Sequence, residues 1–485
     1  MAFLRELIQN SLDAGTQLIE VMVDYDEESS GCFVTVKDTG EGMDSAIIET
    51  KLTRLFSSTK EDDFTKIGKF GIGFVSIFAI DPQLVVLETG KDGESWRVLF
   101  KPDRTFEKRA LDHPVEGTSV TVFTKIPKRE LKKLSKDCEK TIRFWCKHSD
   151  VEICFNGDGI NEEFSLKNTG YQYRHIAPGT EAVVAPSYKE LGFQGYYNRG
   201  LTLLEGPGSP FPHVSFKVRS RYLEHTLSRD NILQDENYER AMSQVKQAAF
   251  QAMPQDLFSK LVDTEEPSLW ALASIIVSYE GVREQFIKRA LFRTSERFVC
   301  FEELPNPLYF TDDLDETVKL AEELNETILL SSESHPKLKL LRSLGLRVEP
   351  LGSAFFRFEL VDMTEKESEL LKVLHEFRPG LSVAGLVDFS SEKPKSWKDR
   401  LGAYLNPSLG LRKVAQKKRL KGDELFLFRK SPLLRQLTKL REKQPELAVS
   451  ILLRKLTLEN NLTMGKEKKI LQRLMKRVIA EETGS

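Results

Sequence analysis

Apolar and polar side chains alternate through the first 125 residues in patterns that predict both helices and strands. A helix is predicted for residues 3–14, where apolar residues recur every three or four positions. Residues 73–80 are apolar all round and predict a buried helix, whereas the stretch between Met43 and Ile67 is polar and has no core pattern. Strands are predicted at 18–25, 32–37, 83–88, 96–100 and 118–123.

The remainder of the chain predicts three further parts. A charged helix at 128–149 connects the first domain, 1–127, to a second α/β domain at 150–345. The region 350–485 is richer in helix, with apolar residues at three- and four-residue spacing in 432–480. The predicted fold class is therefore α/β (α+β), with an α/β domain at the N-terminus, an α/β middle domain and a mostly helical C-terminal region.

Composition agrees with a globular chain of several domains. At 485 residues, and with roughly 150 residues per domain, about three domains are expected. The net charge of −2 excludes a polybasic nucleic-acid coat over the whole molecule. No apolar run is long enough for a transmembrane helix, and five cysteines do not make a disulfide framework, so a cytoplasmic protein is expected. Cys138, Cys146 and Cys154 lie too far apart in sequence for a zinc site.

Positive charge gathers in the last part of the chain. From Arg412 to Ser485 there are 20 Lys and Arg residues against 8 Asp and Glu residues. Two interpretations stay open for this part and for its KKRLK run at 417–421: solvated helix faces, or contact with an acidic partner or nucleic acid.

Three polar side chains share one face of the first predicted helix. Glu6, Asn10 and Asp13 are spaced four and three apart, so at 100° per residue they fall within about 60° of one another. Such a stripe is ordinary on a surface helix when taken alone. Its meaning depends on three further motifs.

The first of these motifs is VKDTGEGM, residues 36–43. Asp38 ends a predicted strand, and a carboxylate at a strand end is able to accept a hydrogen bond from an exocyclic amine. Gly40 and Gly42 follow, and glycines allow the backbone to approach a ligand closely. A simple turn is the alternative interpretation of this segment.

The other two motifs are also rich in glycine. IGKFGIGF, residues 67–74, leads into the apolar helix, and backbone N–H groups at such a turn form a phosphate cradle. It is not a P-loop because no GK[ST] follows, and not a dinucleotide fingerprint because the preceding segment is polar. In EGTSVTVF, Gly117 and Thr118 open a predicted strand, which is common in any β protein.

The order and spacing of these four motifs resemble the GHKL ATPase superfamily of gyrase, HSP90 chaperones, histidine kinases and MutL. Within it, FLRELIQNSLDAG and IGKFGIGFVSIFAI resemble the HSP90 chaperones most closely. The mismatch-repair proteins share NSLDAG, but their third motif has a GFRGEAL-type sequence that this chain lacks. The chain begins inside the first-motif helix, so an N-terminally short ATPase domain is expected.

The resemblance implies a Bergerat-type two-layer α/β sandwich that binds ATP and Mg²⁺. Asn10 would bind Mg²⁺ through its side-chain oxygen, and Glu6 would orient and activate the attacking water. Asp38 would accept a hydrogen bond from the adenine amino group. The full set of implied ATP-binding residues is Asn10, Asp13, Asp38, Gly40, Gly42, Met43, Gly68, Phe70, Gly71, Ile72, Gly73, Phe74 and Thr118.

Two other segments gain a role from the resemblance. The 44–66 stretch would close as a lid over the nucleotide, with Ser58, Thr59 and Lys60 as candidate contacts. Residues 215–234 resemble the catalytic segment of the chaperones' middle domain, so Arg229 would reach the γ-phosphate as an arginine finger does. Gln234 stands one place away from the family's glutamine, and we do not assign it that role.

The resemblance implies an ATP-hydrolysing chaperone whose partners are unfolded or partly folded client proteins. A DNA-processing or signalling GHKL ATPase, MutL-like, and a nucleotide-sensing module without turnover are the alternatives. The apolar surface of 432–480 has two interpretations, a homodimer interface or packing within its own domain. Neither a membrane nor a nucleic-acid partner is expected.

Overall fold

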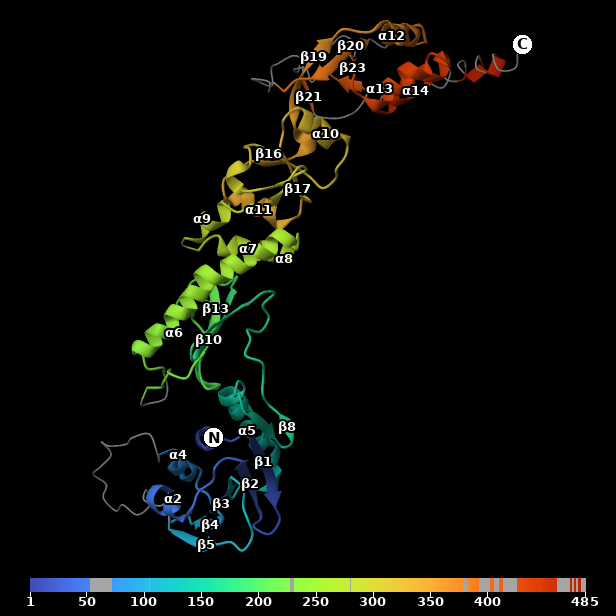
Figure 1. Ribbon diagram of the computed structural model, residues 1–485. Helices are drawn as coiled ribbons and strands as arrows, with labels where there is room; N and C mark the ends of the chain where they lie inside the picture. The colour runs from blue at the N-terminus through green and yellow to red at the C-terminus, as the bar shows by residue number, and fades with distance from the viewer. Residues whose placement is uncertain are drawn as a thin grey trace. The chain divides into compact units, whose positions relative to one another are not determined.

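The computed structural model describes residues 1–52, 72–103, 105–226, 231–279, 281–377, 383–391, 402–404, 410–412 and 425–459, with residues 472, 475–476 and 479–480. The chain forms two compact units, Met1–Leu257 and Phe258–Ser485 (Figure 1). Among the residues described, no helix combines the length and the apolar character that crossing a membrane requires.

The first unit begins with an eight-stranded sheet in the order β5-β4-β3-β6-β2-β1-β7-β8. Every neighbouring pair is antiparallel except β1 and β7, which run parallel. The strands are β1 (Leu18–Asp26), β2 (Gly31–Asp38), β3 (Leu84–Lys91), β4 (Glu94–Phe100), β5 (Phe106–Ala110), β6 (Thr118–Phe123), β7 (Glu152–Phe155) and β8 (Asp158–Gly159).

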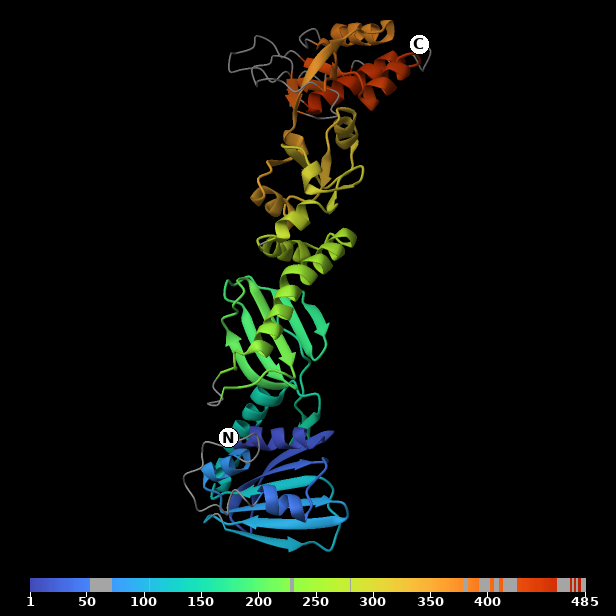
Figure 2. The same cartoon turned by 60° about the vertical axis from the view of Figure 1, so that its left-hand side comes forward.

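Helices cover one face of this sheet (Figure 2). The inward residues of β1 and the apolar stripe of α1 (Ala2–Asp13) share one core, which confirms the periodicities read from the sequence. On β1, Ile19, Val21 and Val23 are buried, whereas Glu20 and Met22 between them are exposed. The result is a two-layer α/β sandwich, with α2 (Ser45–Ile47), α4 (Ile72–Val75) and α5 (Leu131–Cys146) as its other helices.

Two segments of this part differ from the sequence prediction. The buried helix expected at 73–80 is α4 followed by a 3₁₀ turn, Ser76–Ile80, in which Ala79 is exposed, because the sheet covers only one side of it. The connecting helix α5 packs against the first sheet through a stripe at four-residue spacing: Leu134, Cys138, Ile142 and Cys146. Since β7 pairs with β1, the first sheet continues past residue 150, where the second domain was predicted to start.

A second sheet of five strands completes the first unit, in the order β12-β11-β13-β10-β9. Helix α6 (Glu236–Gln247) lies across one face of it (Figure 2). It is followed by a π-helical turn and by α7 (Met253–Asp263). The strands are β9 (Tyr173–Ala177), β10 (Thr180–Pro186), β11 (Phe193–Asn198), β12 (Leu201–Pro207) and β13 (Val214–Ser220).

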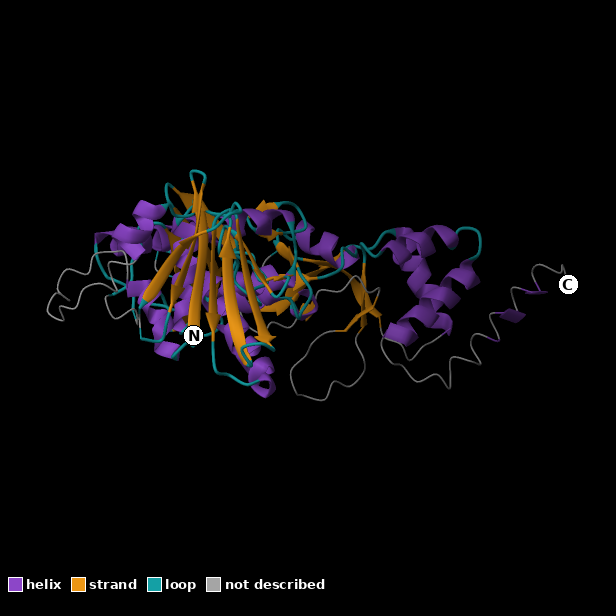
Figure 3. Cartoon of the chain, turned by 90° about the horizontal axis from the view of Figure 1, so that it is seen from below, coloured by secondary structure: helices purple, strands orange, loops and turns teal. Residues whose placement is uncertain are grey.

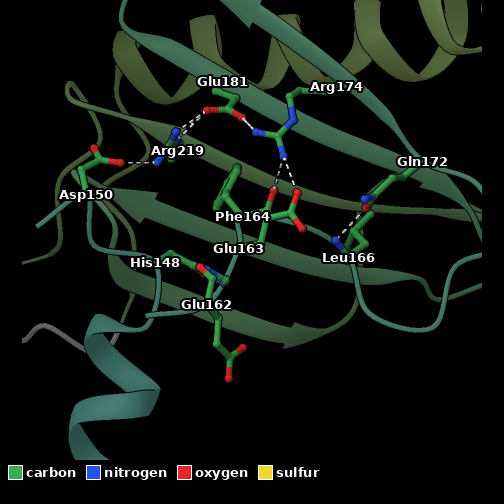
Figure 4. Close-up of polar contacts among 10 residues, drawn as sticks. All are labelled: His148, Asp150, Glu162, Glu163, Phe164, Leu166, Gln172, Arg174, Glu181 and Arg219. Carbon is green, nitrogen blue, oxygen red and sulfur yellow. Dashed lines mark hydrogen bonds and ion pairs between the residues drawn. The ribbon is translucent and has the colours of Figure 1, made fainter. Parts of the chain in front are cut away.

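Ionic contacts join the end of α5 to the second sheet. Arg219 of β13 lies between Asp150, 2.6 Å away, and Glu181 of β10, and Glu181 also pairs with Arg174 (Figure 4). One residue along from α5, Lys147 pairs with Glu205 of β12 at 2.6 Å. The two sheets are therefore connected through side chains as well as through the chain itself.

A buried lysine and histidine lie at the same junction. The Nζ atom of Lys217 is 2.8 Å from Nε2 of His148, whose Nδ1 donates to the carbonyl oxygen of Glu162 at 3.1 Å. Burial, with Lys217 and Lys147 nearby, lowers the pKa of His148 to about 4. The imidazole is therefore neutral and accepts a hydrogen bond from the ammonium group.

We expect His148 to make the protein less stable in acid. The pKa of His148 is near 6.5 in the unfolded chain and about 4 in the folded protein. At a pH between these two values, His148 is protonated in the unfolded chain and neutral in the folded protein. The free energy of unfolding should therefore fall as the pH drops from 6.5 to 4, by up to about 3 kcal/mol from this group. Thermal unfolding across this range should show a shallower slope for His148→Gln than for the wild type. The exposed His113→Gln is the control, and equal slopes for wild type and His148→Gln would contradict the assignment.

The second unit starts with helices and a small parallel sheet. Strand β16 (Leu308–Thr311) lies between β17 (Ile328–Leu330) and β18 (Val348–Pro350). The boundary between the two units divides the middle domain predicted at 150–345. The other elements here are α8 (Pro267–Ile276), α9 (Val282–Ile287), β14 (Phe292–Arg293), β15 (Phe298–Val299), α10 (Glu316–Glu323) and α11 (Pro336–Ser343).

A mostly helical C-terminal region is not confirmed, because its described residues contain strands as well as helices (Figure 3). The strands form a five-stranded sheet in the order β21-β19-β20-β23-β22. The two strands of three residues, β21 and β22, carry little periodic signal, which is why the sequence did not indicate them. Buried leucines of the three helices share one cluster with Leu386 and Leu427 of the sheet. The elements are β19 (Phe355–Val361), α12 (Glu365–Phe377), β20 (Val383–Phe389), β21 (Gly402–Tyr404), β22 (Gly410–Arg412), β23 (Leu425–Phe428), α13 (Pro432–Leu440) and α14 (Pro445–Glu459).

Candidate functional site

Helix α1 presents the polar stripe predicted from the sequence. One side of the helix is buried through Phe3, Leu4, Leu7 and Ile8. This burial fixes the rotation of the helix, and so the direction of its other side chains. Glu6 lies at the edge of the buried side, with 7% of its surface exposed, whereas Asn10 and Asp13 are exposed. The helix ends at Asp13 and is followed by Gly15 in the left-handed region.

The carboxylate of Asp38 is buried and held by several hydrogen bonds. It is 5% exposed at the end of β2 and accepts three hydrogen bonds. Ser11 of α1 donates its hydroxyl to Oδ2 at 2.7 Å, and the backbone N–H groups of Gly40 and Thr118 donate to Oδ1 at 2.9 and 3.2 Å. A carboxylate has about four lone-pair sites, so these bonds, counted over the described part of the chain, leave one acceptor position for a ligand.

Threonine hydroxyls extend this network on both sides of Asp38. Thr89 of β3 accepts from the backbone N–H of Met43 at 2.8 Å and donates to the carbonyl of Gly117 at 3.0 Å. Thr16 accepts from the backbone N–H of Thr39 at 3.0 Å. Hydroxyls that donate and accept at once connect the ends of β2, β3 and β6 with the end of α1.

Glycines let three backbone segments meet beside Asp38. Gly117 has φ = +69°, and a Cβ atom placed on it would lie 2.0 Å from the carbonyl oxygen of Asp38. A Cβ on Gly42 would lie 2.0 Å from the carbonyl oxygen of Gly90, and one on Gly40 would lie 2.8 Å from the Cβ of Ala14. The DTGEG and EGT motifs therefore pack against each other as backbone, with no room for side chains.

Replacing Gly117 by alanine should destabilise the first unit strongly. The new methyl group would overlap the backbone of Asp38, and the left-handed conformation adds a strain of roughly 1 kcal/mol. We expect the thermal unfolding midpoint to fall by several degrees and nucleotide affinity to fall with it. Gly93→Ala is the matched control, because Gly93 also has a positive φ but has open space around it. Equal unfolding temperatures for the two variants would contradict this packing.

The structure brings together part of the predicted ATP site. Asp38, Gly40, Gly42 and Thr118 lie in one hydrogen-bonded cluster with the end of α1. Phe74 of α4 is buried against Phe100, with ring centroids 5.2 Å apart, so it belongs to the core. Ile72 and Gly73 begin α4. The remaining predictions lie outside the described residues: Gly68, Phe70 and Gly71 of the phosphate loop, Ser58, Thr59 and Lys60 of the lid, and Arg229.

Sequence reasoning missed the residues that support Asp38. Ser11 is buried and faces inward, because it lies four residues after Leu7 and three after Ile8 on the apolar side of α1. Thr89 and Gly90 follow the strand predicted at 83–88 and belong to β3, and a glycine within a strand is a signal of close backbone approach. The sequence therefore offered a local signal at both positions: the glycine at 90, and the helical period at Ser11.

A metal ion at this site would depend on more than protein ligands. Among the residues that the structure describes, no group of three or more His, Cys, Asp or Glu side chains is arranged to hold one. Mg²⁺ commonly takes one or two protein ligands and fills its shell with waters and substrate phosphates. The exposed amide of Asn10 on the stripe of α1 fits such a role.

The two-layer sandwich, with a buried aspartate at a strand end facing a helix that carries Glu6 and Asn10, defines a GHKL-type ATPase domain. Residues 2–132 match the family described as histidine kinase-, DNA gyrase B-, and HSP90-like ATPase. The HSP90-like resemblance of the motifs is thereby confirmed for this domain.

The relatives that match this chain point to one group within that family, the HtpG chaperones. The chain is 30% identical over 161 residues to chaperone protein HtpG of Wigglesworthia glossinidia brevipalpis, which is 26% of this chain and 25% of that protein. It is 28% identical over 160 residues to chaperone protein HtpG of Coxiella burnetii, with the same shares. It is 24% identical over 259 residues to chaperone protein HtpG of Helicobacter hepaticus, which is 46% of this chain and 41% of that protein. The chain thus matches between a quarter and two fifths of these relatives' length.

Proposed function

We propose that this protein is an ATP-driven chaperone that resembles HSP90. The observation that supports it most is the network of Asp38, in which three donors hold a buried carboxylate and leave one acceptor position. An exocyclic amino group such as that of adenine matches this position. The similarity to the HtpG chaperones supports the assignment of client proteins as partners.

The side chains of α1 would then act on the phosphates. Glu6, at the edge of the buried side, would hold and activate the attacking water, and Asn10 would hold Mg²⁺ on the exposed stripe. When bound, Mg²⁺ would neutralise the charge that develops on the phosphates. Asp13 and Thr118 would support the base pocket next to Asp38.

Lid closure and arginine docking are the finer steps of the proposal. Closure of the 44–66 stretch would exclude water from the site, and Arg229 would stabilise the charge on the γ-phosphate. A homodimer remains part of the proposal as well. The packing of α13 and α14 into their own domain accounts for part of the apolar surface of 432–480 and leaves the dimer to be tested.

Phosphate release tests the proposal directly. The wild type should hydrolyse ATP only when Mg²⁺ is present, and Arg229→Ala should lower turnover by 10³-fold or more without a matching loss of ATP affinity. In parallel, the wild type should suppress aggregation of a heat-denatured model protein in an ATP-dependent way. ATP binding without turnover would favour the nucleotide-sensing module. Binding to duplex DNA that weakens steeply with salt would favour the DNA-processing alternative.

A further inference from the structure

Helix α1 makes side-chain contacts with the second-sheet part of the first unit near both of its ends. At the first end, the guanidinium group of Arg5 contacts Nε2 of His225 and lies over the ring of Trp145, 4.3 Å from its centroid. At the other end, Asp13 pairs with Arg199 at 3.3 Å. Of the polar stripe, Glu6 and Asn10 lie between these two contacts along the helix, and Asp13 makes the second one.

The contact at Arg5 is buried and depends on a neutral imidazole. Arg5 is 7% exposed, and Trp145 of α5 packs edge-on against His225 at 6.5 Å between ring centroids. Burial and the neighbouring Arg5 lower the pKa of His225 to about 4, so the ring carries no charge near neutral pH. A neutral ring nitrogen is an acceptor that an arginine is able to use, whereas a protonated ring would repel it.

The contact at Asp13 comes from a turn with little freedom. Arg199 and Gly200 connect β11 to β12, and both have positive φ angles, +45° and +83°. A Cβ atom on Gly200 would lie 2.1 Å from the carbonyl oxygen of His148, so the turn is pressed against the end of α5. An arginine in the left-handed region costs roughly 1 kcal/mol, and such strain often marks a position with a function.

The two contact points are connected within the second-sheet part. The side-chain amide of Asn198, next to Arg199, donates to the carbonyl oxygen of Leu223 at 2.7 Å. Two residues further on, His225 pairs with Ile232 in a β-bridge. Arg199 and His225 therefore belong to two segments that are joined by hydrogen bonds, and together these segments form a support that contacts α1 at two places.

The Asp13–Arg199 pair alone would be a modest stabilising interaction, since an exposed ion pair contributes about 0–1 kcal/mol. The joint placement of the two contacts carries more meaning, because a helix held near both ends keeps its position and rotation fixed against the support. We propose that Arg199 and His225 are positioning residues that hold α1, and with it Glu6 and Asn10, in the geometry for ATP turnover. This inference rests on the proposed function and deepens it.

The test compares turnover with affinity in the full chain. We expect His225→Leu and Arg199→Ala each to lower kcat for ATP by about tenfold or more, because small misplacements of a reacting group are costly, while the Kd for ATP stays within about twofold. His225→Gln, which keeps an acceptor oxygen, should restore most of the turnover. Arg221→Ala is the matched control, since Arg221 is an exposed arginine that contacts its neighbour Tyr222.

Each outcome decides the inference. Unchanged turnover in both His225→Leu and Arg199→Ala would overturn it, and so would an equal loss in His225→Leu and His225→Gln. If the wild type binds ATP but does not hydrolyse it, turnover is no longer a readout. Amide hydrogen exchange then tests the inference. Residues 196–206 and 218–226 should then exchange more slowly with ATP bound in the wild type and not in His225→Leu, and no difference would overturn the inference. A wild type that binds no ATP would overturn the proposed function together with this inference.

Discussion

Replacing Glu6 by glutamine is expected to abolish ATP turnover while ATP binding persists. The amide has nearly the same size and shape as the carboxylate, so α1 keeps its packing, but it is unable to accept a proton from the attacking water. General-base catalysis contributes about 10²–10⁴-fold to enzymatic rates, and a loss of at least 100-fold in kcat is expected. Phosphate release measures the turnover, and calorimetric titration with a non-hydrolysable ATP analogue measures the binding.

Glu20→Gln provides the control for this variant, because Glu20 is exposed on the outer face of β1, away from the helices. It should retain the turnover of the wild type. A Glu6→Gln protein that keeps more than a third of the wild-type turnover would show that the base lies elsewhere. A variant that loses binding and turnover together would place Glu6 in nucleotide binding instead.

Replacing Asp38 by asparagine should weaken ATP binding strongly. All three groups around this side chain are donors, from Ser11, Gly40 and Thr118, and the amide nitrogen of asparagine would place another donor among them. The acceptor position assigned to the adenine amino group is also weakened. A hydrogen bond to a charged group contributes about 1.5–3 kcal/mol, so its loss should lower ATP affinity by about 10- to 150-fold.

Loss of binding has to be separated from loss of folding in this variant. Thermal unfolding sets the temperature at which the titration is performed, well below the midpoint of the variant. Ser11→Ala is the graded control, since it removes one of the three donors and leaves the carboxylate, and its affinity should fall by no more than about tenfold. A folded Asp38→Asn protein that binds ATP within threefold of the wild type would contradict the role of Asp38.

Much of the first sheet was predictable, because its signals are local. Alternating side chains in β1 and β2 and the apolar stripe of α1 each follow from the period of a single element. The parallel pairing of β1 with β7 was not predictable in this way, since it joins residues more than 130 positions apart and depends on how α5 packs against the sheet. The three-residue strands β21 and β22 were missed because they are too short to show a period.

The sequence by itself determined the chemistry of the candidate site. Glu6, Asn10 and Asp13 share a helical face, and Asp38 and its glycines follow a strand, because residue type and spacing are properties of the chain. Only the tertiary structure decided how these parts meet: which donors surround Asp38, where Thr89 and Gly90 close the backbone packing, and which residues contact α1 near its ends. Such contacts join segments distant in sequence, and their geometry follows from the packing of whole elements rather than from any local pattern.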